Sequence, residues 1–303
     1  MYDPSDPRSA LMAAPKRAAP PALPAADAEY GLFYRDPPTE DDANGRTWFA
    51  RGQNFIVAYS ELTPGATFER SGQIDEFMVL LPYPGTPIVA SAGGQEERSE
   101  GYALIVMPPG DSRVAFPEGG CVVRLFSAQS PDLAAKCANA EAYAAQHANI
   151  PPFEPWPDPV DGFRIRVYSL DVPKQEGRAG KIWRCTTMMV NMPGTRFGPR
   201  DLTKLSPHSH DDFEQCSLAL SGTWTHHMRW PWTIDYHDWK ADVHAVVQSP
   251  SITVIPPPVL HTSACGEGEN QLVDIFAPPR FDFSSRPGWV LNADEYPMPA
   301  GKD

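Results

Sequence analysis

The sequence has no long apolar run and no paired cysteines. No window approaches the roughly 18 consecutive apolar residues that a membrane-spanning helix requires, and the N-terminal residues lack the apolar stretch of a secretion signal. The cysteines are odd in number, widely spaced and without a C-x-x-C pair: Cys121, Cys137, Cys185, Cys216 and Cys265. We therefore expect no membrane association, no disulfide scaffold and a cytoplasmic protein.

Positive charge is also scarce. The chain of 303 residues carries 25 Lys and Arg against 38 Asp and Glu, which gives a formal net charge of −13. Such a surface repels phosphate backbones, so general nucleic-acid binding is excluded as a main function. A small anionic substrate stays compatible with this charge, because a local arginine or a metal ion can outweigh the field of the whole protein.

Proline and glycine, in contrast, are abundant. The 35 prolines and 22 glycines separate short β-branched and aromatic runs, a pattern that is typical of antiparallel sandwiches and barrels. The pattern occurs twice, in residues 54–128 and again in residues 163–283. "ALIVMPPGDSRV" in the first segment resembles "SITVIPPPVLHT" in the second, so we infer an internal duplication.

The duplication predicts how the chain is divided. The Ala- and Pro-rich start, residues 1–29, is expected to be a flexible tail. The first domain then spans residues 30–129 and the second spans 160–283, with a C-terminal tail at 284–303. Between the domains, "SPDLAAKCANAEAYAAQHANI" begins with a serine N-cap and a proline and is rich in alanine, so we expect a helical linker over residues 130–159.

The second domain holds the strongest candidate site. His208, His210 and Glu214 in "SPHSHDDFEQCSLALSG" lie at even spacing just before an apolar run. If this segment is extended, the three side chains point to one face, because side chains alternate along a strand. His261 follows a proline-rich turn and is a fourth candidate. Imidazole and carboxylate groups are suited to Zn, Mn, Fe, Co, Ni or Cu.

These residues resemble the two sequence motifs of the cupin superfamily. The first motif matches at His208, His210, Glu214 and Gly222, with the glycine one residue later than in the commonest spacing. The second matches at Pro256, Pro258 and His261, where Pro258 stands at a position that is usually glycine. The resemblance implies an all-β fold of two double-stranded β-helix (jelly-roll) barrels in tandem, and one divalent transition metal per chain in the C-terminal barrel.

The first half departs from the metal motif. Alignment of Glu76 with Glu214 places Arg70, Gly72 and Arg113 at the three histidine positions, and this half has no histidine before His147. We expect a structural domain that lacks metal ligands. The alternative is that Arg70 and Arg113 form an anion site there.

The segment between the C-terminal motifs, residues 223–250, is rich in tryptophan and histidine. It is expected to be a hairpin that either packs on the barrel or walls the pocket. His226 and His227 face opposite ways on a strand, so at most one points inward. The candidate catalytic residues are Arg229, as an anchor for a substrate carboxylate, and His227 and Cys216, as proton carriers.

The cupin resemblance leaves three functions open. The first is a dioxygenase acting on a small oxygenated organic acid or aromatic compound, with iron as the favoured metal. The second is a non-redox lyase, isomerase or hydrolase on a small carboxylate or sugar-like substrate, in which Mn, Zn or Ni acts as a Lewis acid. The third is a non-catalytic small-ligand-binding protein. We also expect a homodimer.

Overall fold

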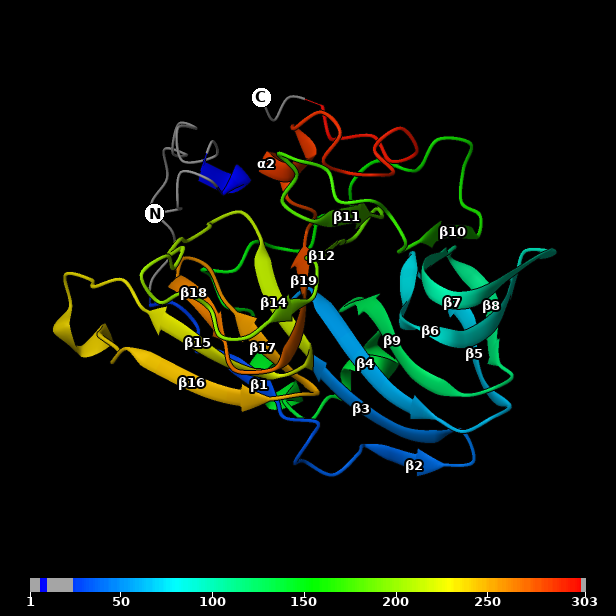
Figure 1. Ribbon diagram of the computed structural model, residues 1–303, viewed down its shortest axis with the longest axis horizontal. Coiled ribbons are helices and arrows are strands. Elements are labelled where there is room, and N and C mark those ends of the chain that lie inside the picture. The colour runs from blue at the N-terminus through cyan, green and yellow to red at the C-terminus, as the bar shows by residue number, and fades with distance from the viewer. Residues whose placement is uncertain (1–5, 10–23, 301–303) are drawn as a thin grey trace.

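The chain folds into two strand-rich units. The computed structural model describes residues 6–9 and 24–300, and Figure 1 shows the two units side by side, the first in blue to green and the second in yellow to orange. Most of the tail expected over residues 1–29 lies outside the described residues. In the described part, no helix is both long and apolar enough to cross a membrane.

The N-terminal unit is one antiparallel sheet that curls on itself. Its strand order is β10-β7-β6-β9-β4-β3-β2, while β8 pairs with both β5 and β6. Its strands are β2 (Glu40–Asp42), β3 (Gly45–Arg51), β4 (Phe55–Leu62), β5 (Ala66–Gln73), β6 (Phe77–Ala92), β7 (Gln95–Met107), β8 (Gly110–Phe116), β9 (Gly120–Ser127) and β10 (Arg166–Ser169).

The C-terminal unit is built from two facing sheets. One has the order β1-β17-β14-β19-β12-β11, with β13 paired to β19, and the other has the order β16-β15-β18. Its strands are β1 (Glu29–Gly31), β11 (Lys181–Arg184), β12 (Met189–Met192), β13 (Arg196–Phe197), β14 (Glu214–Ser221), β15 (Thr223–Arg229), β16 (Val243–Gln248), β17 (Ser251–Ile255), β18 (Leu260–Cys265) and β19 (Glu269–Ala277).

The two units exchange one strand each. Strand β1 precedes the first unit in the chain but pairs with β17 of the second. Strand β10 lies in the range expected for the second domain but pairs with β7 of the first. Each unit therefore completes its sheet with backbone from the other half of the chain.

Helical structure is limited to single turns. The alanine-rich linker contains only α1 (Pro131–Ala134) and the 3-10 turn η2 (Ala140–Tyr143). The other helical turns of the described residues are a 3-10 turn at 7–9, η3 (Tyr236–Asp238) and α2 (Phe281–Ser284). Pro131 begins α1 as expected, but the helix does not continue, and Asn139 beyond it bonds to the backbone of Arg51 in the first barrel. The C-terminal segment packs on the protein, since Trp289, Val290 and Tyr296 are buried.

The largest apolar core lies between the two units. It joins residues such as Phe55, Val57 and Leu125 of the first unit with Cys216 and Leu218 of the second. Alternate residues of β14 face this shared core, because side chains on a strand alternate between its two faces. The residues between them face the interior of the C-terminal barrel, where the candidate site lies.

Candidate functional site

Three histidines meet at the end of the C-terminal barrel. His208 and His261 face each other in a short backbone bridge, in which each amide donates to the other's carbonyl, at 3.0 and 2.8 Å. The ring centroid of His261 lies 4.4 Å from that of His208 and 5.1 Å from that of His210. The structure thus brings together the three histidines that the sequence singles out.

Each of these imidazoles has its Nδ1 against a backbone carbonyl. The acceptors are the oxygens of Ser206, Phe213 and Val259, at 2.8, 2.9 and 2.9 Å. A carbonyl only accepts, so each Nδ1 carries the hydrogen and each Nε2 keeps its lone pair. Burial lowers the pKa of His208 and His210 well below the usual value and that of His261 to about 4. The rings are therefore neutral at pH 7, which is the form that binds metals.

Besides the three histidines, Gln215 directs a side-chain oxygen to the same point. Its Oε1 lies 3.3 Å from Nε2 of His210 and 3.3 Å from Nε2 of His261. Its amide nitrogen donates to Ser217 Oγ at 3.3 Å and to Asp274 Oδ1 at 3.4 Å, which orients the oxygen toward the rings. Three lone pairs therefore converge with no hydrogen between them. A cation satisfies such an arrangement, and two imidazoles with an amide oxygen fit a borderline divalent metal.

Glu214 points the other way. Its carboxylate accepts hydrogen bonds from the backbone amides of Gln53 at 3.1 Å and Asn54 at 3.2 Å, in the other unit. The expectation that Glu214 shares a face with the histidines is wrong, because residues 211–213 form a bend and β14 begins only at Glu214. The late position of Gly222 was the available signal, since the commonest spacing places Gln215, not Glu214, at the ligand position. Among the described residues, no three His, Cys, Asp or Glu side chains are arranged to hold a metal ion.

The residues expected to be catalytic lie away from the histidines. Arg229 is 64% exposed and pairs with Asp242, and Nδ1 of His227 lies 2.8 Å from Nδ1 of His244 on the outer face of the β15–β16 hairpin. Cys216 is buried in the core between the units, and burial raises the pKa of its thiol well above the usual value. Their placement in the pocket is therefore corrected: alternation along β15 turns Arg229 and His227 outward, and β14 turns Cys216 toward the other unit.

His226 is the histidine of β15 that points inward. It is 1% exposed, and its Nδ1 lies 2.8 Å from Ser263 Oγ. Its Nε2 is buried and has no hydrogen-bond partner in the described part of the chain. Burial lowers the pKa of His226 to about 3, and the neighbouring His261 adds to this effect.

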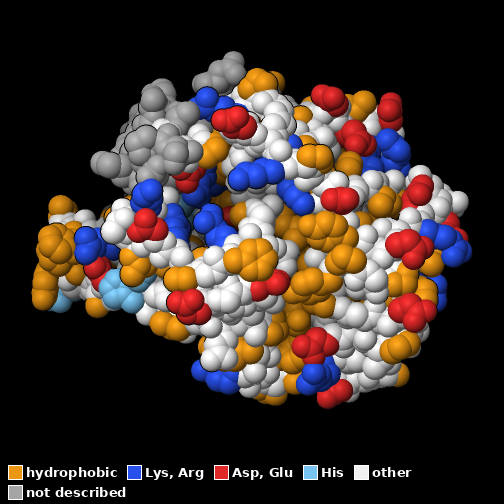
Figure 2. Space-filling view, in the orientation of Figure 1, with side chains coloured by type: hydrophobic (Ala, Val, Ile, Leu, Met, Phe, Trp, Pro, Cys, Tyr) orange, Lys and Arg blue, Asp and Glu red, His pale blue; other side chains and the backbone are white. Residues whose placement is uncertain are grey.

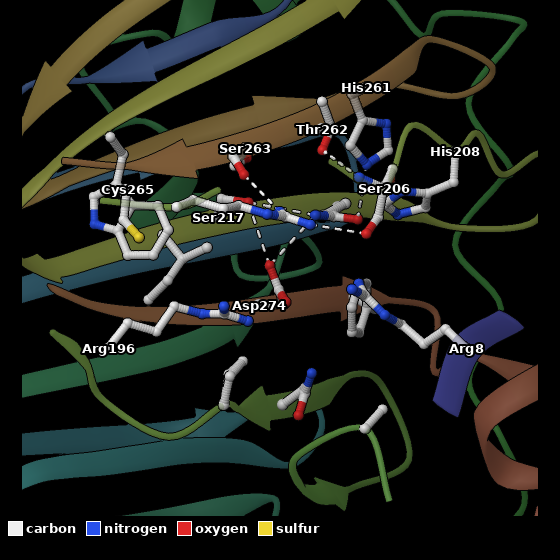
Figure 3. Close-up of a pocket in the computed structure, with 18 of the residues that line it drawn as sticks. Arg8, Arg196, Ser206, His208, Ser217, His261, Thr262, Ser263, Cys265 and Asp274 are labelled. Carbon is white, nitrogen blue, oxygen red and sulfur yellow. Dashed lines mark hydrogen bonds between the residues drawn. The ribbon is translucent and has the colours of Figure 1, made fainter. Parts of the chain in front are cut away.

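A cavity of about 100 Å³ extends from His208, His261 and Gln215 into the barrel. Figure 3 shows Asp274 in this cavity, with its carboxylate toward the residues of β14. Ser217 Oγ donates to Asp274 Oδ1 at 3.3 Å, and burial raises the pKa of this aspartate. Sequence reasoning missed Asp274, although one acid inside the apolar run "QLVDIFA" was a signal for it.

Comparison with known proteins identifies the fold. No protein-family model and no curated protein matches the sequence, but solved structures match in three dimensions. AerE from Microcystis aeruginosa is 10% identical with a TM-score of 0.51, over 76% of this chain and 91% of that chain. A variant of oxalate decarboxylase from Bacillus subtilis is 12% identical with a TM-score of 0.51, over 84% of this chain and 78% of that chain. The chain has the cupin fold.

The fold class expected from the sequence, two jelly-roll barrels in an all-β chain, is confirmed by these matches. A cupin 2 conserved barrel domain protein from Leptotrichia buccalis also matches, at 9% identity and a TM-score of 0.44, over 84% of this chain and 97% of that chain. At such identities the likeness shows the fold alone.

In the N-terminal cupin barrel, Arg70 and Arg113 lie at a shallow, open pocket whose lining also includes Glu69, Glu96 and Asp111. Arg70 pairs with Asp132, and Arg113 lies 3.6 Å from Glu69 on the surface. The barrel interior is filled by an apolar cluster that includes Phe77, Phe116 and Phe126. The two arginines are engaged with carboxylates, and the alternative of an anion site formed by them stays a prediction.

Proposed function

We propose that the C-terminal cupin barrel is a metal-dependent enzyme that acts on a small oxygenated organic compound. The observation that carries this proposal is the convergence of three lone pairs, on His210 Nε2, His261 Nε2 and Gln215 Oε1, with no hydrogen between them. His208 would complete the donor set from the adjoining bridge. Deeply buried neutral imidazoles, each oriented by a backbone carbonyl, are what a resident divalent metal requires.

The donor set favours Lewis-acid chemistry over oxygen chemistry. All four side chains are uncharged, so a divalent ion bound there would keep its full charge for polarising a carbonyl or carboxylate oxygen of the substrate. This supports the lyase, isomerase or hydrolase alternative over the dioxygenase that the sequence first favours.

Asp274 is the side chain placed to move a proton. Its carboxylate is deep in the cavity, and Gln215 and Ser217 both hydrogen-bond to it. A general base has to lie within hydrogen-bond reach of the proton that it takes, and Asp274 lines the same cavity as His208, His261 and Gln215. We therefore assign Asp274 the role of proton acceptor, with Ser217 holding the carboxylate in place.

The test begins with metal content. Protein purified without chelators should hold about one divalent metal per chain, and a His208→Ala/His261→Ala variant should hold almost none. The wild-type protein is then incubated with small 2-oxo, 2-hydroxy and dicarboxylic acids in D₂O, and NMR follows product formation and exchange of C–H bonds next to carbonyl groups. We expect the same turnover with and without O₂.

Two results would overturn this proposal. Equal metal content in the wild type and the double variant would remove the metal site. Turnover that consumes one O₂ per product and stops without oxygen would restore the dioxygenase reading.

A further inference from the structure

Arginines gather in the same cavity as the histidines. Its wall includes Arg8, Arg196, Arg200 and Arg280, and Asp274 is its one acidic residue among the described residues. Figure 3 shows Arg8 and Arg196 reaching in from opposite sides with Asp274 between them. In a protein with a net charge of −13, this is a local excess of positive charge.

Two of these guanidinium groups form no salt bridge with a carboxylate among the described residues, although Asp6 lies close enough to attract Arg200 and Asp274 close enough to attract Arg196. Arg200 donates to the carbonyl of Ser263 at 2.7 Å, to Ser206 Oγ at 2.8 Å and to the carbonyl of Lys204 at 3.2 Å, all of them uncharged acceptors. Arg196 makes no ion pair within residues 6–9 and 24–300. Arg280 differs, because it pairs with Asp282 and stacks on Phe283.

The third guanidinium comes from the start of the chain. Arg8 lies in the short turn of residues 6–9, where it pairs with Asp6 at 2.6 Å, and it reaches the cavity about 200 residues away in sequence from His208. The proximity of Arg8 and Arg196 contributes to lowering the pKa of Arg200, after burial as the main cause. Like charges held this close repel each other. The carboxylates of Asp6 and Asp274 offset part of this repulsion, and three guanidinium groups against two carboxylates leave a net positive charge that an anion can neutralise.

Figure 2 agrees with this picture. On the face shown, Lys and Arg side chains gather around a hollow over the C-terminal barrel, with a few Asp and Glu side chains next to them and others over the rest of the face. A cleft lined by one sign of charge attracts the opposite sign even when the whole protein repels it.

We propose that Arg8, Arg196 and Arg200 form a carboxylate-binding pole, so that the substrate is a small organic acid whose acid group lies at the arginines. Its reacting end then faces His208, His261 and Gln215. This orientation rests on the proposed function, whereas binding of the acid group at the arginines does not. Guanidinium groups suit this role because their paired N–H donors match the two oxygens of a carboxylate.

The size of the cavity agrees with a small acid. A volume of about 100 Å³ corresponds to roughly three to seven ordered water molecules. An acid of a few carbons fits this space.

Calorimetric titration of full-length protein, freed of metal by a chelator, tests the arginine pole. The probes are oxalate, malonate and succinate, with the uncharged malonamide as the control ligand. We expect at least one of the dicarboxylates to bind with millimolar or better affinity, more weakly as salt is added, and malonamide not to bind. Arg196→Gln and Arg8→Gln should each raise the dissociation constant about tenfold or more, since each removes a charged hydrogen-bond donor.

Arg229→Gln is the matched control, because Arg229 is an exposed arginine of the same barrel that lies outside the cavity. Its affinity for the dicarboxylates should equal that of the wild type. Arg200→Gln is not needed for the test, because Arg200 also donates hydrogen bonds to the carbonyls of Ser263 and Lys204 and its loss can impair folding. The variants of Arg8 and Arg196 decide whether the arginines bind the acid group.

The two proposals fail in different ways. No binding of any dicarboxylate to metal-free protein, or equal affinity in the wild type, Arg196→Gln and Arg8→Gln, overturns the arginine pole and leaves the metal site untouched. Dicarboxylate binding by a protein that takes up no metal upholds the arginine pole and overturns the proposed enzyme.

Discussion

Glu76 and Glu214 occupy equivalent positions in the two barrels, and each accepts hydrogen bonds from the backbone of the opposite barrel. Glu76 accepts from the amide of Thr186 at 3.0 Å and from its hydroxyl at 2.9 Å. Glu214 accepts from the amides of Gln53 and Asn54. Glu76 immediately precedes β6 and Glu214 is the first residue of β14, so both acids lie at the start of a strand and join the two units reciprocally.

The same symmetry extends to the segments that follow each barrel. "NAEAY" at residues 139–143 and "NADEY" at residues 292–296 are equivalent. Tyr296 donates its hydroxyl to Glu76 at 2.9 Å, and Tyr143 hydrogen-bonds to Glu214. Asn139 bonds to both backbone groups of Arg51, at 3.0 and 2.9 Å, and Asn292 makes the same pair with Arg184, at 3.1 and 2.9 Å. The duplicated unit therefore includes its trailing segment.

Replacing either glutamate should destabilise the protein without removing the metal. In Glu214→Gln, an amide NH₂ faces a backbone N–H that now lacks its acceptor, and an unsatisfied buried donor costs about 1–3 kcal/mol. Glu76→Gln should lose a similar amount in the other barrel. Urea unfolding measures the loss, and elemental analysis measures the metal. A Glu214→Gln protein that is stable but free of metal would make Glu214 a ligand after all.

Gln215 should control metal affinity. Gln215→Ala removes the oxygen that meets His210 and His261, and we expect the affinity to fall at least ten- to hundred-fold, as it does when weaker supporting contacts are lost. Gln215→Glu should instead bind the metal more tightly, because it adds a negative charge to a neutral donor set. Competition with a chromophoric chelator gives both constants. Equal affinity in the wild type and Gln215→Ala would remove Gln215 from the site.

Asp274→Asn should slow turnover and leave the metal bound. A positioned general base contributes typically about 10²–10⁴ to the rate, so we expect kcat to fall by at least about a hundred-fold, with a smaller change in KM. Ser217→Ala is a milder variant, since it keeps the carboxylate of Asp274 but removes one of its hydrogen-bond donors. We expect kcat to fall less in this variant than in Asp274→Asn. If Asp274→Asn exchanges substrate protons with D₂O as fast as the wild type, another group carries the proton.

The sequence predicted what depends on residue type and local order. Histidine is rare in the chain, and His208, His210 and His261 stand next to proline-containing segments, so the sequence singled them out. They meet in the structure as expected. The prediction for Glu214 was wrong because side chains alternate between two faces only within a continuous strand, and the chain bends between His210 and Glu214. Arg8 could not be found, because no motif in the sequence links residues 6–9 to the cavity of the second barrel. The exchange of β1 and β10 was equally hidden, since short edge strands carry no mark of their partner.

Buried histidines should make the metal-free protein sensitive to acid, and His226 allows one of them to be measured alone. Its pKa is about 3 in the folded protein and about 6.5 in an unfolded chain. Between these values the unfolded state holds a proton that the folded state lacks, so the free energy of unfolding decreases as the pH falls from 6.5 toward 3. The slope is about 1.4 kcal/mol per pH unit for this one group.

His226→Asn isolates this effect, because an amide nitrogen can still donate to Ser263 while the titrating group is gone. Urea unfolding of the wild type and the variant is compared at several pH values from 7 to 4, both without metal. The wild type should lose stability relative to the variant by about 1.4 kcal/mol for each unit below pH 6, whatever the other acids and histidines contribute, since these are common to both. A difference that does not change with pH would mean that His226 keeps an ordinary pKa and that its Nε2 has found a partner.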